Sequence, residues 1–427
     1  MDINTFVESF GGRIMTPSEN RDILDFYNSI SMSSEKFAVI TRKEPDYFRF
    51  LKYVSERYFF IGFPNADGHP EGMVVLIVRP CYINGKPDLV GHFLDLRFKR
   101  RRERTITADW KDMALGFTRR GQDIEELNGC RLFHGSYITT NIYATEAIGE
   151  DKTAKKENKT AGSGAGSKPA PEKAGAAAAA ASGSPVEAFQ VSNLATYQAV
   201  NIYARKPGKA LGLGGFKRSS GVFTVSRGRE EDRQQLGEFL DKQNRSKTFG
   251  YIYAGESDEL ERRLRDWDGF TMASFFIARD ESGEIAGAFG VFDPGAGRQI
   301  YIDKIPAEKA LLAKAGKMAG LKVPEPNKKI DILYLTTFEL DHHLSGEERL
   351  DVFDRLLEAL YKSGLPGDYH IVSFCDYSRQ SLLEVVQKGY MYDATPVLLY
   401  QLHAPEAEEV YREAELACPP GHEMVLM

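Results

Sequence analysis

A strand, a basic loop and a helix follow one another between Leu89 and Leu127. The first part alternates, which predicts a strand with Val90, His92, Leu94, Leu96 and Phe98 on one face and Phe93, Asp95 and Arg97 on the other. The last part has the helical period, with an apolar stripe of Ile106, Trp110, Met113, Ala114, Phe117 and Ile124. The loop between them carries Arg97, Lys99, Arg100, Arg101, Arg102 and Arg104. Because a helix N-terminus offers free N–H groups, this order predicts either a phosphate site or a solvated charged turn.

The order of elements around this segment occurs twice in the chain. The first half predicts a short strand near Gly11, two helices, and a hairpin whose turn is Asn84-Gly85. The second half predicts a strand at 222–226, two helices, a hairpin around 281–284 and a central strand at 330–340. A capping box from Ser345 to Glu348 opens the next helix, and each half ends in a closing strand. We interpret this as an internal duplication of one α/β unit with a mixed sheet.

Two changes of composition divide the chain. Residues 150–187 are mostly Ala, Gly, Ser, Lys and Glu, so they lack the apolar surface needed for a core and predict a disordered insert. A shorter glycine-rich stretch at 207–221 reads as a linker. We therefore expect one domain at 1–206, a second at 222–403, and a C-terminal tail at 404–427.

Composition narrows the class of protein. The chain has 427 residues, of which 42% are apolar, and a net charge of −6, which argues against a nucleic-acid partner. Four cysteines without metal-ligand spacing, no signal peptide and no membrane-length apolar run predict a cytoplasmic protein. We expect no metal site, because His342 and His343 beside Asp341 would point apart at a strand end. The aromatic residues between Tyr47 and Phe60 have the spacing of core residues rather than of an acyl pocket.

Three short segments resemble the GNAT acyltransferase superfamily. Asp95-Leu-Arg-Phe98 is similar to the end of the family's fourth strand, and Asn141-Ile-Tyr-Ala144 to the start of its fourth helix. In the second half, 378–383 with Lys388-Gly-Tyr390 resembles the same helix. The resemblance implies two tandem domains in which the fourth strand splays from the fifth and a glycine-rich turn holds the pyrophosphate of acyl-coenzyme A. That turn departs from the family here, since Arg102-Glu-Arg-Thr-Ile-Thr107 has no glycine.

The resemblance also assigns candidate roles. An acetyl-CoA or longer acyl-CoA donor would contact Leu96, Phe98, Arg101, Arg102, Arg104, Thr105, Ile106, Thr107 and Asn141. Tyr143 is the candidate acid for the leaving thiolate, while His92 or Asp95 would take the proton of the amine directly or through water. Each of these three residues also fits an ordinary structural role. The second half has Asp341, Glu347 and Glu348 at the equivalent loop, so we expect that half to be structural.

Three functions remain open at this point. The first is an acyl-CoA-dependent N-acyltransferase whose acceptor, a small-molecule or peptide amine, lies in the cleft between the domains. The second is a binding or scaffold protein that has kept the fold without the cofactor. The third is an aminoacyl or long-chain acyl transferase with a carrier-bound donor, because an acidic acyl carrier protein would dock on the arginine loop.

Overall fold

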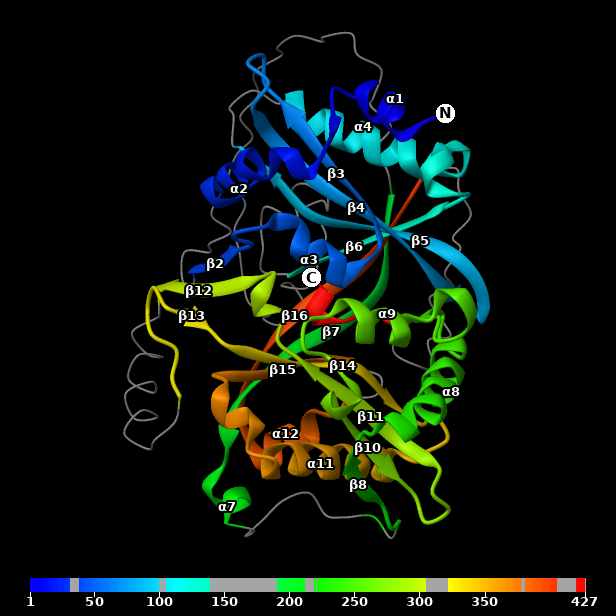
Figure 1. The fold of residues 1–427 in the computed structure, drawn as a ribbon, viewed down its shortest axis with the longest axis vertical. Coiled ribbons are helices and arrows are strands. Elements are labelled where there is room, and N and C mark those ends of the chain that lie inside the picture. Colours follow the sequence, from blue (N-terminus) through cyan, green and yellow to red (C-terminus); the bar gives the residue numbers. More distant parts are fainter. Residues whose placement is uncertain are drawn as a thin grey trace, which may run out of the picture.

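One large mixed sheet runs through the whole molecule (Figure 1). The computed structural model describes residues 1–30, 38–99, 105–138, 190–211, 219, 221–304, 322–377, 381–404 and 420–426. The sheet order is β1 (Arg13–Met15), β3 (Arg57–Pro64), β4 (Pro70–Ile83), β5 (Lys86–Phe98), β6 (Leu132–Ile138), β16 (Tyr390–His403), β7 (Gln190–Arg205), β15 (Ile371–Tyr377), β14 (Ile332–Leu340), β11 (Ile285–Phe292), β10 (Phe275–Arg279) and β8 (Thr224–Arg227). A thirteenth strand, β9 (Phe249–Tyr251), pairs with β4. A separate small sheet holds β2 (Ala38–Arg42), β12 (Gln299–Lys304) and β13 (Lys329–Ile330).

The strand order reads the same from both edges, and this confirms the repeated plan predicted from the sequence. β4 and β5 are antiparallel while β5 and β6 are parallel. In the second half, β11 and β14 are antiparallel while β14 and β15 are parallel. The two central strands, β5 and β14, therefore occupy matching places on either side of the middle of the sheet.

The two halves exchange their closing strands. β16, from the end of the chain, lies between β6 and β7, and β7 pairs in turn with β15 of the second half. β7 and β16 are paired along their whole lengths, from Arg205 opposite Tyr390 to Gln190 opposite His403. In Figure 1 these two strands cross the centre of the molecule and join the halves into one sheet. The sequence predicted both closing strands but not their exchange.

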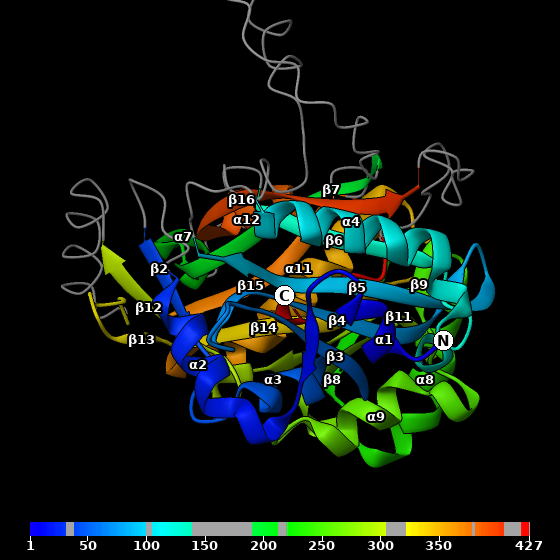
Figure 2. The same ribbon diagram turned by 90° about the horizontal axis from the view of Figure 1, so that it is seen from above.

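Helices cover both faces of the sheet (Figures 1 and 2). α1 (Ile3–Glu8) and α4 (Thr105–Arg120) pack on one face of the first half, and α11 (Gly346–Lys362) and α12 (Leu383–Gly389) pack on one face of the second. The opposite faces carry α2 (Asn20–Ser29) and α3 (Tyr47–Val54) in the first half, and α8 (Arg233–Arg245) and α9 (Glu259–Asp266) in the second. The short α7 (Pro207–Ala210) follows β7. No helix in these described segments is long and apolar enough to cross a membrane.

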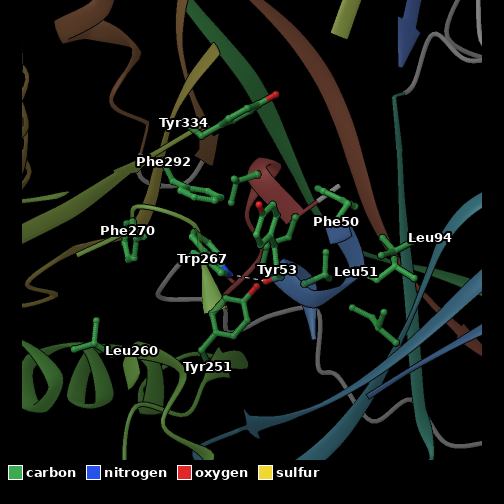
Figure 3. Packing of buried hydrophobic residues seen from close by; sticks show 14 of the residues in the cluster. Phe50, Leu51, Tyr53, Leu94, Tyr251, Leu260, Trp267, Phe270, Phe292 and Tyr334 are labelled. Atoms are coloured by element: carbon green, nitrogen blue, oxygen red, sulfur yellow. Dashed lines mark hydrogen bonds between the residues drawn. The ribbon is translucent and has the colours of Figure 1, made fainter. Parts of the chain in front are cut away.

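The helices α2, α3, α8 and α9 share a single hydrophobic core between the halves (Figure 3). Tyr53 of α3 makes an edge-to-face contact with Phe292, and its carbonyl oxygen accepts a hydrogen bond from Trp267 Nε1 at 2.8 Å. Arg262 donates to the last carbonyls of α3, at Lys52 and Tyr53, where a cation complements the helix dipole. The aromatic residues of 47–60 therefore belong to the core, as their spacing predicted.

Candidate functional site

A β-bulge interrupts the central strand of the first half. Met73 of β4 lies opposite Arg97 and Val75 lies opposite Leu94, so Asp95 and Leu96 together oppose one residue. Asp95 has a φ of 51°, the left-handed region that few non-glycine residues adopt. The extra residue inverts the alternation of the strand. The predicted face of Val90, His92, Leu94, Leu96 and Phe98 is therefore wrong beyond Leu94.

Because of the bulge, the side chains from Asp95 onwards lie on the opposite faces of the sheet from those predicted. Leu96 and Phe98 pack with Phe93 against the core under α1 and α4. Asp95 and Arg97 instead point towards α2 and α3, where Arg97 stacks on the Tyr27 ring at 3.6 Å. A strand of regular pleat would have placed these two sets the other way round.

In the first half, the neighbouring strands β5 and β6 diverge near the bulge. β5 and β6 are paired from Val90 opposite Leu132 to Phe93 opposite Gly135. Beyond this point β5 stays with β4 and β6 stays with β16, so the two strands diverge and leave an opening in the pairing of the sheet. β5 ends at Phe98 and α4 begins at Thr105, which brings the start of a long helix to the same end of the sheet. Beyond Phe93, no ladder pairing joins β5 to β6 in the described part of the chain.

A buried ion pair holds the bulge in place. Lys43, which is 1% exposed, pairs with the Asp95 carboxylate, and Tyr47 Oη donates to the same oxygen at 2.5 Å. Burial would raise the pKa of Asp95, but the charges of Lys43 and Arg97 lower it to about 2. Burial also lowers the pKa of Lys43 to about 8, against the opposing effect of Asp95. A carboxylate with so low a pKa is a weak base, so these contacts favour a positioning role for Asp95.

This pair makes stability depend on pH in the acid range. The pKa of Asp95 is depressed in the folded state, so its contribution is present above the unfolded value and is lost as pH falls through about 2. We expect the stability difference between wild type and Asp95→Asn to shrink by roughly 2 kcal/mol between pH 5 and pH 2. Urea unfolding at several pH values in this range measures it. A difference that stays constant would mean that Asp95 is not preferentially ionised in the folded protein.

His92 lies deeper, in the paired part of β5. Its ring stacks on His134 of β6 at 4.3 Å, and both rings are 1% exposed. Burial, followed by the charges of His134, His422 and Arg79, holds the pKa of His92 well below its usual range. The imidazole is therefore neutral, and it lies apart from the Asp95 ion pair although the two residues are close in sequence.

The structure describes only some of the other residues predicted to contact acyl-CoA. Thr105, Ile106 and Thr107 form the first turn of α4, and Leu96 and Phe98 lie beside the opening. Five predicted site residues fall outside the described residues. They are the predicted acyl-CoA contacts Arg101, Arg102, Arg104 and Asn141, and the predicted acid Tyr143. Their assignment stays a prediction.

The second half repeats the bulge, with Thr337 at a φ of 49° and Ala288 and Gly290 opposite Glu339 and Thr336. Here the C-terminal segment occupies the opening. Glu423 Oε1 accepts a hydrogen bond from the Thr337 backbone N–H at 3.0 Å, and Glu423 Oε2 accepts one from Thr336 Oγ1 at 2.5 Å. A cavity of about 80 Å³ remains beside it.

The start of α11 is also capped by side chains of the helix itself. Ser345 accepts from the Glu348 backbone N–H at 3.3 Å, and the Glu348 side chain accepts from the Ser345 backbone N–H at 2.9 Å, as the predicted capping box requires. In the second half, therefore, the C-terminal segment occupies the strand opening and the chain's own side chains cap the helix start. The structural role of this half remains our interpretation.

Sequence reasoning missed several residues around these openings. Lys43 stands in the charged run Arg42-Lys43-Glu44, which is typical of a surface. His134 shares the period of two with Leu132 and could have been placed beside His92 once β6 was assigned next to β5. His422 and Glu423 were assigned to a tail, yet residues 420–426 are largely buried and lie near the centre of Figure 1. His342 and His343 were expected to point apart, which is wrong: they lie in a turn after β14, with ring centroids 3.9 Å apart.

No family model matches this sequence, and no curated protein matches it. Solved structures do resemble it. Saccharomyces cerevisiae N-myristoyltransferase with bound myristoyl-CoA aligns over 92% of this chain and 77% of its own, with 9% identity and a TM-score of 0.52. The same enzyme with myristoyl-CoA and inhibitors aligns over 92% and 80%, with 11% identity and a TM-score of 0.51. A GCN5-related glucosamine N-acetyltransferase region of a fungal multi-domain GH3 β-N-acetylglucosaminidase aligns over 91% and 38%, with 8% identity and a TM-score of 0.50. At these identities the likeness is one of fold: the chain has the fold of the GNAT acyltransferases, with the strand pattern of that fold present twice.

Proposed function

We propose that this protein is an acyl-CoA-dependent N-acyltransferase whose donor lies in the first half. The observation that carries the proposal is the opening between β5 and β6, which begins at the Asp95 bulge and faces the start of α4. The similar N-myristoyltransferase structures contain myristoyl-CoA, which supports a long acyl-CoA as well as acetyl-CoA. The acceptor is an amine on a small molecule or peptide.

The reaction requires little of the protein beyond placement and proton transfer. The amine nitrogen forms a bond to the thioester carbon, the carbon–sulfur bond breaks, and the thiolate of CoA leaves. One proton passes from the amine to a base and one reaches the thiolate. His92, acting through water, and Tyr143 are the base and acid that the sequence suggests; the buried His92 has a depressed pKa and is, like Asp95, a weak base, so the assignment of Tyr143 as acid is the one we propose. Asp95 and Lys43 would hold the bulge that orients the strand edge towards the thioester.

Titration with CoA species tests the proposal directly. We expect myristoyl-CoA or acetyl-CoA to raise the unfolding free energy, by about 2.7 kcal/mol at one hundred times its dissociation constant. Thermal shift and calorimetry with myristoyl-CoA, acetyl-CoA and free CoA measure the effect and rank the chain lengths. The matched control is free CoA, which lacks only the acyl group and so tests whether the acyl thioester contributes to binding.

Two other results would point to different functions. An absence of any shift with all CoA species would contradict the proposal and favour a scaffold protein that has kept the fold. Acyl transfer from an acylated carrier protein, without binding of free acyl-CoA, would favour the carrier-fed alternative. The second result also predicts that the acidic carrier dissociates at high salt, because the arginine loop would be its docking surface.

A further inference from the structure

Three buried histidines converge where the C-terminal segment crosses the sheet. His92 and His134 lie opposite each other in the parallel pairing of β5 and β6, and His422 approaches them from residues 420–426. The ring centroid of His422 is 5.5 Å from that of His92 and 6.4 Å from that of His134. One ring nitrogen of each residue lies within 4.8 Å of the others. All three side chains are at most 3% exposed.

Four of the six ring nitrogens of this cluster lack hydrogen-bond partners among the described residues. The unpartnered atoms are His92 Nε2, His134 Nε2 and both nitrogens of His422. A buried polar atom without a partner costs roughly 1–3 kcal/mol, so a concentration of four at one place calls for a ligand. Neutral imidazole nitrogens are ligands that Zn²⁺ and related divalent ions prefer.

The positive charge of Arg79, beside the cluster, restricts which further ligand the cluster could bind. The Arg79 guanidinium is buried over the Tyr251 ring at 4.6 Å, and its Nε and Nη1 have no hydrogen-bond partner in the described chain. A positive charge beside a dication is unfavourable unless an anion lies with them. Three histidines leave a fourth position on a tetrahedral ion, and an anionic fourth ligand there would balance the charge of Arg79.

We propose that His92, His134 and His422 form a binding site for a divalent transition-metal ion, Zn²⁺ in the first instance, whose fourth ligand is an anion such as hydroxide. This goes beyond the proposed acyl transfer, and it assigns His92 a different role from that of base. The ion would bind the C-terminal segment to β5 and β6, so metal removal should loosen that segment. His92 would then be a ligand and could not serve as the base.

The experiment uses the full chain, freed of any affinity tag and stripped with a chelator. We expect about one Co²⁺ per chain to bind with the visible absorption of a four-coordinate ion, and Zn²⁺ to displace it. Chelation should lower the thermal midpoint of the metal-loaded protein. An unstripped preparation analysed by mass spectrometry shows which metal the protein carries.

Matched variants distinguish this site from adventitious binding. His422→Gln and His134→Gln should each lower Co²⁺ affinity by at least tenfold, whereas His69→Gln should leave it unchanged, because that residue is exposed and belongs to neither group of potential metal ligands. Circular dichroism checks the fold of each variant, and the wild-type titration stands if one of them fails to fold. Absence of Co²⁺ binding by the wild type, or equal binding by a folded His422→Gln variant, would overturn the proposal.

Discussion

Replacing Arg263 by methionine should lower the unfolding free energy by about 3–5 kcal/mol, the largest stability loss we expect from a single substitution. Arg263 is fully buried on α9 and its guanidinium holds two carboxylates. Its Nε lies 2.8 Å from Glu259 Oε1, and its Nη1 lies 2.9 Å from Glu423 Oε2. Both glutamate side chains are less than 15% exposed; without the arginine, Glu259 keeps its pair with Arg262, whereas the nearly buried charge of Glu423 loses its cation.

The same arginine joins three parts of the molecule. Its Nη1 also donates to Thr337 Oγ1 at 2.8 Å, in the bulge of β14, and its guanidinium lies over the Trp267 ring. Loss of Arg263 should therefore release the C-terminal segment as well as weaken α9. We expect limited proteolysis to cut near residue 420 more readily in the variant.

Arg265→Met is the matched control on the same helix. Its guanidinium pairs with Glu56 and Asp266 but is 60% exposed, and exposed ion pairs contribute about 0–1 kcal/mol. Urea unfolding of both variants and of wild type measures the two costs. Equal losses for Arg263→Met and Arg265→Met would show that the buried arginine does not hold the segment in place.

Local chemistry explains which parts of the fold the sequence predicted. The β4–β5 hairpin turns at Asn84 and Gly85, with φ values of 49° and 79°, because these residue types tolerate the left-handed conformation. The start of α11 followed from the Ser345–Glu348 capping box for a similar reason. In both cases the determinants lie within a few residues of one another.

Non-local contacts explain what the sequence did not predict. Residues 94–98 alternate as a regular strand does, and the bulge at Asp95 follows from pairing with β4 and from Lys43, which lies far away in the sequence. The exchange of β7 and β16 does not change the alternation of apolar and polar residues in either strand, so the sequence does not reveal it. His422 meets His92 and His134 only because the chain returns to the centre of the sheet after β16. No spacing rule connects residues brought together in this way.

Replacing Arg101, Arg102 and Arg104 together by alanine should abolish CoA binding, provided that this loop holds the phosphates of the donor. The loop joins the end of β5 to the start of α4 and has no glycine that would let the backbone approach a phosphate. Arginine side chains would then supply the contacts, each charge-assisted hydrogen bond contributing about 1.5–3 kcal/mol. Loss of two such contacts already amounts to more than about a hundredfold in affinity.

Salt and a matched variant separate this effect from a general change of charge. Exposed arginine contacts are screened, so wild-type affinity for myristoyl-CoA should fall between about 50 and 500 mM salt, roughly one-third to three times the physiological ionic strength. The control replaces Arg21, Lys52 and Lys86, which are exposed on the same half of the chain, and should keep both affinity and stability. Unchanged binding by the loop variant would identify a solvated turn. Lost stability without lost binding would mean that the arginines pair with carboxylates of the chain itself, and Asp109 and Asp112 are the nearest candidates in the sequence of α4.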